Sequence, residues 1–181
     1  MNAFVFPGQG SQHLGMGADL YNSNKKAQQI FEDANEILGF KITDIMFGED
    51  QKALKQTNIT QPAIYIHSMV TALIANKFFK PDAVAGHSLG EFTALAAANY
   101  ISFEDGLTLV QKRAVAMQEA CEKNESSMAA IVGLEDKIVE DVCLESKETL
   151  VTANYNCPGQ IVISGTINAV NLACKKLTEL G

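Results

Sequence analysis

A serine between two glycines, in the spacing Gly86-x-Ser88-x-Gly90, is the feature of this sequence best suited to chemistry. The short apolar run 83–85 precedes it, and residues 91–98 have the composition of a helix. A serine in a tight turn between a strand and a helix is typical of a nucleophile elbow, in which the hydroxyl is lifted toward a substrate. Glycines let the strand and the helix approach closely, and N–H groups at the helix start stabilise negative charge. The pattern predicts a nucleophilic serine, and the alternative is a glycine-rich turn after a buried strand.

A nucleophilic serine needs a base within hydrogen-bond distance, and the sequence contains three histidines. His87 adjoins Ser88, so its side chain is expected to point away from the serine across the turn. His67 falls in an apolar helical segment, which favours a buried structural role. His13 follows a glycine-containing loop and is expected to be solvated. The sequence therefore predicts a nucleophile, but none of these three histidines is expected to serve as its base.

The elements that must position Ser88 are predicted by apolar periodicity. A first strand is expected to end in the tight loop Pro7-Gly8-Gln9-Gly10, and Pro62 suits the first turn of a helix. The predicted elements, in chain order, are a strand over 2–6, helices over 24–38 and 62–78, and the strand 83–85 and helix 91–98 on either side of Ser88.

Another helix is predicted to begin after Ser102, which can cap it, with Asp105 as a weaker form of the capping box. One stripe of this helix is apolar and is expected to be its buried face. The stripe consists of Leu107, Val110, Ala114, Met117 and Cys121. The polar segment 124–127 then marks a boundary, so we expect one subdomain over 1–124 and a second over 125–181.

The second subdomain is predicted to have the order β-α-β-β-α. Its elements are strands over 128–132, 150–153 and 160–164, a helix over 135–145 and a closing helix over 167–180. This order lacks one strand of the ferredoxin-like β-α-β-β-α-β unit. We therefore expect the chain to stop before its fold is complete.

Composition narrows the class of protein. The chain has 181 residues, 47% of them hydrophobic, which suits one globular domain or two closely packed ones. A formal net charge of −7 argues against nucleic acid as a partner, and the sequence has neither a membrane-length apolar run nor a signal peptide. The four cysteines and three histidines lack the spacing of a zinc site. A cytoplasmic enzyme without a metal site and without a membrane association is expected.

Several segments together resemble one enzyme family. The chain is similar throughout its length, in the expected order, to malonyl-CoA:acyl-carrier-protein transacylases and to the acyltransferase domains of fatty-acid and polyketide synthases. The segments that carry the resemblance are Pro7-Gly8-Gln9-Gly10-Ser11-Gln12, Thr60-Gln61-Pro62-Ala63, Gly86-His87-Ser88-Leu89-Gly90-Glu91, Arg113 and Asn156-Cys157-Pro158-Gly159-Gln160.

The resemblance implies a role for each candidate site residue. Ser88 would carry the acyl group as an oxyester, and the backbone N–H groups of Leu89 and Gln9 would hold the oxyanion. Arg113 would pair with the free carboxylate of the malonyl group, although its helix position alone favours a surface ion pair. Met117 would line the acyl pocket, with a core methionine as the alternative.

The same resemblance implies an α/β fold. The large subdomain would be α/β-hydrolase-like, with a largely parallel sheet covered by helices on both sides, and the small one ferredoxin-like, with the active site in the cleft between them. The substrates would be malonyl-CoA and the phosphopantetheine thiol of acyl carrier protein, in fatty-acid biosynthesis, with no other cofactor.

The family's catalytic histidine belongs to a segment beyond Gly181, so both subdomains are expected to be truncated and residues 1–181 alone to be a weak enzyme. Two other functions compete with the transacylase. A general serine hydrolase would share the elbow but would not need Arg113, and a binding module would fold without turnover.

Overall fold

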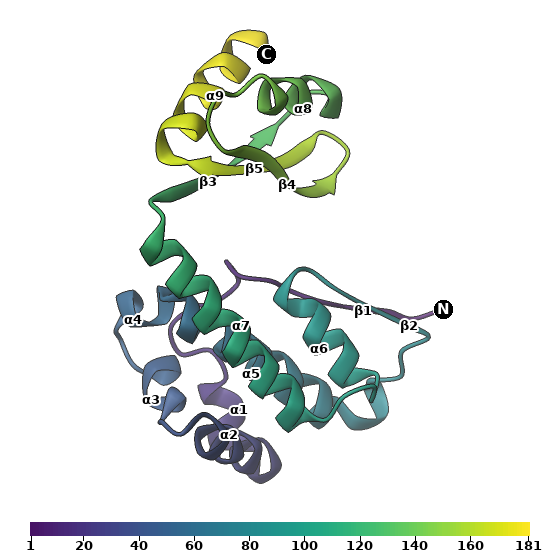
Figure 1. The fold of residues 1–181 in the computed structure, drawn as a ribbon. Helices are drawn as coiled ribbons and strands as arrows, with labels where there is room; N and C mark the ends of the chain where they lie inside the picture. The colour runs from purple at the N-terminus through teal and green to yellow at the C-terminus, as the bar shows by residue number, and fades with distance from the viewer. The chain divides into compact units, whose positions relative to one another are not determined.

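The computed structural model describes residues 1–181, and its internal contacts divide the chain into two units, Met1–Glu119 and Ala120–Gly181 (Figure 1). This division lies a few residues before the predicted boundary, within the last turns of a helix that ends at Lys123. No helix of the structure is both long and apolar enough to cross a membrane. Each unit is described by itself.

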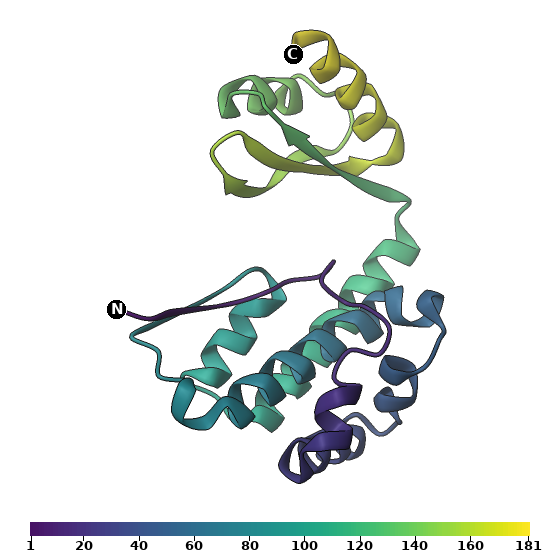
Figure 2. The same cartoon turned by 180° about the vertical axis from the view of Figure 1, so that it is seen from behind.

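The first unit contains a two-stranded parallel sheet formed by β1 (Ala3–Phe6) and β2 (Ala83–Gly86). Both strands run alongside α6 (Leu89–Ala97), as the two opposite views show (Figures 1 and 2). Phe6 is buried on the side that packs against α5 and α6, whereas Val5, on the other side, is 77% exposed. The strands are parallel as predicted, but the expectation of helices on both sides is wrong for this sheet, because the face that includes Val5 is uncovered.

Seven α-helices surround the core of this unit. In addition to α6 they are α1 (Ala18–Ser23), α2 (Lys25–Leu38), α3 (Ile42–Phe47), α4 (Gln51–Lys55), α5 (Thr57–Ala75) and α7 (Phe103–Lys123), and a 3-10 turn, η1 (Asn76–Phe78), follows α5. The largest fully buried side chains of the unit include Phe31, Ile42, Met46, Leu54 and Tyr65. The short helices α1, α3 and α4 were not predicted, because five or six residues are too few to establish a helical period.

Helix α5 begins five residues earlier than predicted, so Pro62 lies inside it and not in its first turn. Proline lacks the N–H that would bond to the carbonyl of Asn58 and usually disfavours such a position. Here every residue from Ile59 to Ile66 is buried, and this packing outweighs the lost hydrogen bond.

Helix α7 is capped as predicted. The Ser102 hydroxyl accepts a hydrogen bond from the Asp105 N–H at 2.9 Å and donates one to the Asp105 carboxylate at 2.7 Å. The predicted buried stripe is correct for its first three members, but Met117 is 39% exposed and Cys121 is exposed. The helix continues past Glu119, so by its contacts Cys121 is grouped with the second unit.

The second unit has the predicted order of elements. They are β3 (Ser126–Val132), α8 (Asp136–Leu144), β4 (Leu150–Cys157), β5 (Gln160–Thr166) and α9 (Ile167–Leu180). The strands form an antiparallel sheet in the order β3-β5-β4, and α8 and α9 bury its apolar residues, among them Ile161 and Ile163. Strand β4 extends to Cys157, so the connection left between the predicted strands, 154–159, is reduced to a two-residue turn with Gly159 at φ 77°.

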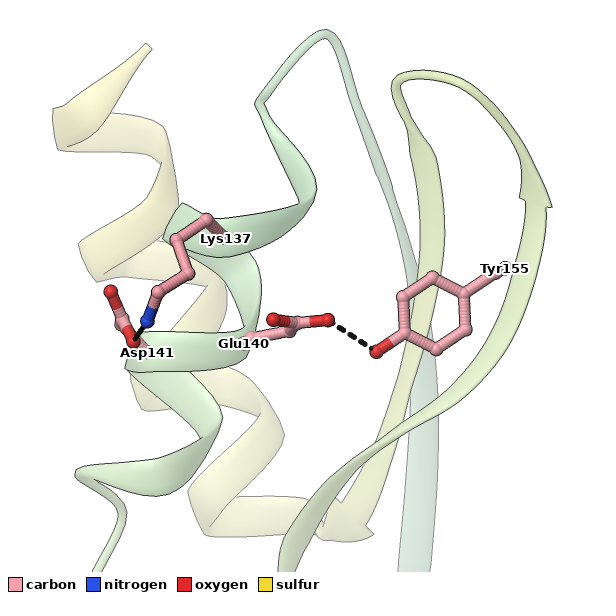
Figure 3. Close-up of polar contacts among 4 residues, drawn as sticks. All are labelled: Lys137, Glu140, Asp141 and Tyr155. Carbon is pink, nitrogen blue, oxygen red and sulfur yellow. Dashed lines mark hydrogen bonds and ion pairs between the residues drawn. The ribbon is translucent and has the colours of Figure 1, made fainter.

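Polar contacts on the outside of this unit join β4 to α8 (Figure 3). The Tyr155 hydroxyl donates to the Glu140 carboxylate at 2.7 Å, and Lys137 forms an ion pair with Asp141 one turn along the same helix. These groups are largely exposed, so they orient the surface of the unit and add little to its stability.

Candidate active site

Ser88 occupies a strained turn between β2 and α6. Its backbone has φ 56° and ψ −110°, and it is one of three non-glycine residues in the structure with a positive φ. A side chain in this region costs of order 1–3 kcal/mol, which the surrounding structure must offset. Because α6 begins at Leu89, the Ser88 hydroxyl and the first N–H groups of the helix lie at the same end of the element.

The two glycines of the motif are required by the close approach of the backbone. A Cβ on Gly86 would lie 2.0 Å from the carbonyl of Gly90, and one on Gly90 would lie 2.3 Å from the carbonyl oxygen of Phe6. The N–H of His87 donates to that same Phe6 oxygen at 3.1 Å, which holds the turn against the end of β1. The steric reason expected from the sequence therefore applies to both glycines.

Arg113 of α7 points at the serine. Its Nη2 donates to the Ser88 Oγ at 2.8 Å, and its Nη1 donates to the Oε1 of Gln61 at 2.5 Å. The ion pairs of the structure involve the N-terminus, Lys137 and Lys176, and none involves Arg113. The alternative of a surface ion pair is therefore wrong within the first unit, where the half-buried guanidinium carries a positive charge that pairs with no carboxylate.

Gln61 connects the remaining predicted residues to Arg113. Its Nε2 lies 3.4 Å from the Oε1 of Gln9 and 3.3 Å from the sulfur of Met117. Gln9 in turn donates from its Nε2 to the hydroxyl of Thr57 at 3.4 Å. The structure thus brings Gln9, Met117 and Arg113 to one buried amide.

Leu89 contributes its backbone N–H to the same site. Its side chain is buried, and as the first residue of α6 it has no helical carbonyl for its own N–H to bond. An N–H in this position, next to a serine hydroxyl, suits the stabilisation of an oxyanion.

Sequence reasoning missed Gln61. The residue stands in a segment that carries the family resemblance, but it precedes the helix predicted over 62–78, and nothing at that position indicates its partners. Its side chain is 1% exposed and makes contacts at both ends of the amide. A buried polar residue in an otherwise apolar helix is the one signal that could have found it.

Two of the three histidines belong to another cluster. The rings of His13 and His67 lie 6.4 Å apart, edge to face. Burial lowers the pKa of His67, and repulsion from His13 lowers it further, against a smaller opposing effect of Asp19. Both effects favour the neutral form of His67, which is half-buried in α5 and not fully buried as expected, and His13 is exposed.

Residues 3–181 match the family described as the acyl transferase domain. The chain belongs to this family. Among the curated members, it is 42% identical over 182 residues to the malonyl CoA-acyl carrier protein transacylase of Staphylococcus aureus strain MRSA252. The aligned region covers 99% of this chain and 59% of that relative. The Bacillus subtilis transacylase is 43% identical over 187 residues, with 99% and 58% covered.

Solved structures of acyltransferases have the same mixed α/β fold. The acyl-carrier-protein S-malonyltransferase of Burkholderia pseudomallei 1710b superposes with a TM-score of 0.91 at 38% identity, and covers 99% of this chain and 59% of its own. A malonyl-transacylase in complex with its type II PKS acyl-carrier protein gives 0.92 at 36% identity, with the same coverage. The chain thus spans about three fifths of the length of these acyltransferases.

The strain at Ser88 of this family member leads to a stability prediction. Ser88→Gly should raise the free energy of unfolding by ~1 kcal/mol or more, because glycine adopts a positive φ without a Cβ penalty. Ser88→Ala keeps the Cβ and should change the free energy of unfolding by much less. Urea denaturation of both variants checks this, and a Ser88→Gly variant no more stable than Ser88→Ala would show that the turn is unstrained.

Proposed function

We propose that this chain carries the nucleophile and the carboxylate-binding arginine of a transacylase. The enzyme would move a malonyl group from malonyl-CoA to the phosphopantetheine thiol of an acyl carrier protein, in fatty-acid biosynthesis. The observation that carries the proposal is the guanidinium of Arg113, whose Nη2 lies 2.8 Å from the Ser88 Oγ and which forms no ion pair with a carboxylate of the first unit. The activity in the names of the relatives agrees with it.

The proposed reaction has two steps at one serine. The Ser88 oxygen attacks the thioester carbonyl of malonyl-CoA, its proton passes to a base, and the carbon–sulfur bond breaks to release coenzyme A. The thiol of the carrier protein then attacks the malonyl oxyester and regenerates the serine. We assign the N–H groups of Leu89 and Gln9 to the oxyanion of both steps, and the reaction needs no cofactor beyond its two substrates.

The distance between Arg113 and Ser88 is the argument for malonyl in particular. In a malonyl group a single methylene separates the free carboxylate from the thioester carbonyl, so a carboxylate site must lie close to the nucleophile. An arginine fork within hydrogen-bond distance of the serine meets this condition, and it can grip a carboxylate through two N–H groups. Met117, beside Gln61, is assigned to the wall of the acyl pocket.

We propose further that residues 1–124 are the hydrolase-like part of the enzyme and residues 125–181 a ferredoxin-like part. The strand–elbow–helix arrangement of β2, Ser88 and α6 supports the first assignment. The antiparallel order β3-β5-β4, with α8 and α9 against its apolar residues, supports the second.

The test is to measure the intact mass of the protein as it is produced in its native organism, before and after exposure to malonyl-CoA. We expect an increase by one malonyl group, its loss when the phosphopantetheinylated carrier protein is added, and no increase in Ser88→Ala. Ser23→Ala, which removes an exposed serine of α1, is the matched control and should be acylated normally. Acylation of Ser88→Ala, or release of free malonate in place of transfer, would refute the proposed function.

A further inference from the structure

We propose that Gln61 is a positioning residue that fixes the guanidinium of Arg113 and couples it to the Gln9 loop. Through this coupling, acyl groups that bear a carboxylate would be selected during the acylation of Ser88 as well as in binding. This inference rests on the proposed function, and it concerns a residue outside the predicted nucleophile, oxyanion and carboxylate sites.

The direction of every hydrogen bond around Gln61 follows from the chemistry of arginine. A guanidinium only donates, so the Gln61 Oε1 must face Arg113 and the Nε2 must face the other way. The Nε2 therefore donates toward the Oε1 of Gln9, which in turn leaves the Gln9 Nε2 to donate to Thr57. Arg113 thus sets the orientation of two amides between the serine and the first loop.

Burial makes Gln61 hard to replace. Its side chain is 1% exposed, so a substitution that removes the amide leaves a cavity and takes away the hydrogen-bond acceptor of the Arg113 Nη1. The residue also stands on α5, whose neighbouring residues from Ile59 to Ile66 are all buried. A side chain on a rigid helix positions its partner more precisely than a side chain on a loop does.

The two bonds of Arg113 suggest how selection would work. With no substrate carboxylate present, the Nη2 rests on the Ser88 Oγ, while the Nη1 is held by Gln61. A malonyl carboxylate draws the Nη2 away and exposes the oxygen, and the Gln61 bond keeps the guanidinium in place meanwhile. An acetyl group has nothing to offer Arg113, so the guanidinium continues to compete for the serine.

Gln61→Glu is the sharpest test, because it preserves the shape of the side chain and supplies Arg113 with a carboxylate of its own. We expect the single-turnover rate of Ser88 acylation at saturating malonyl-CoA to fall ~100-fold. In the variant, Arg113 would pair with the new carboxylate at position 61, and it would no longer be available to the malonyl carboxylate. The rate with acetyl-CoA should change less than ~3-fold, because acetyl makes no use of Arg113. Ser68→Ala, another buried polar position of α5, is the matched control and should leave both rates unchanged.

The outcomes separate the inference from the proposed function. If the wild-type protein takes no malonyl group at Ser88, the proposed function itself fails. If the wild type is acylated and Gln61→Glu keeps the wild-type ratio of malonyl to acetyl rates, only the role of Gln61 is refuted. A purely structural role would lower both rates together with the thermal stability, and that result also overturns the proposal.

A second variant covers the case in which Gln61→Glu does not fold. Gln9 is exposed, so Gln9→Ala removes the far end of the same chain of bonds without opening the core. We expect it to lower the malonyl-to-acetyl ratio ~5-fold through the acylation rate, with the KM for malonyl-CoA nearly unchanged. An unchanged ratio in Gln9→Ala contradicts the coupling.

Discussion

Replacing Arg113 with alanine should lower the acylation of Ser88 by malonyl-CoA by ~10²–10⁴-fold, because two charge-assisted hydrogen bonds to the substrate carboxylate, each ~1.5–3 kcal/mol, are lost. The rate with acetyl-CoA should be unchanged or raised, since the same substitution frees the Ser88 Oγ from its 2.8 Å contact. The ratio of the two rates, measured by intact mass over time, reports the role of the arginine separately from any general damage.

Two further variants sharpen this experiment. Arg113→Lys keeps the positive charge but loses the planar fork, so it should recover only part of the malonyl rate. Lys112→Ala removes the neighbouring, exposed cation of α7 and should leave both rates at their wild-type values. Equal losses with malonyl-CoA and acetyl-CoA in Arg113→Ala would rule out a carboxylate site at this arginine.

Gly86→Ala should destabilise the first unit by at least ~3 kcal/mol, the upper part of the range for overpacking a close backbone contact. The new Cβ would lie 2.0 Å from the backbone carbonyl of Gly90, and because the position of a Cβ is fixed by the backbone, no rotamer change can move the two groups apart. The strand or the helix must shift, and Ser88 lies between them. The free energy of unfolding from urea denaturation measures the effect.

Gly39→Ala is the matched control for this substitution. Gly39 follows α2 at φ 75°, and a Cβ there meets nothing within 4 Å, so only the conformational cost of ~1 kcal/mol applies. The cost at Gly39 arises from its positive φ, which Gly86 does not have, so a larger loss in Gly86→Ala reports the clash. If Gly86→Ala is no more destabilising than Gly39→Ala, the elbow tolerates a wider separation of β2 and α6.

The features that the sequence determined are those with a local physical cause. The requirement for Gly86 is local, because its Cβ would meet the backbone of Gly90 four residues on, whereas the requirement for Gly90 comes from Phe6 at the end of β1. The cap formed by Ser102 and Asp105 is equally local, because it joins residues three apart. The element order of the second unit follows from apolar periodicity in segments long enough to show it.

The features that only the tertiary structure decided depend on contacts between distant segments. Gln61 lies 52 residues from Arg113 and 56 from Met117, and no pattern within α5 encodes those contacts. The core of the first unit also decided two boundaries that the sequence did not show. Helix α5 begins ahead of Pro62, and the apolar stripe of α7 is buried only as far as Ala114. A hydrogen-bond partner or a buried face is a property of the assembled fold, because each needs an atom that another element supplies.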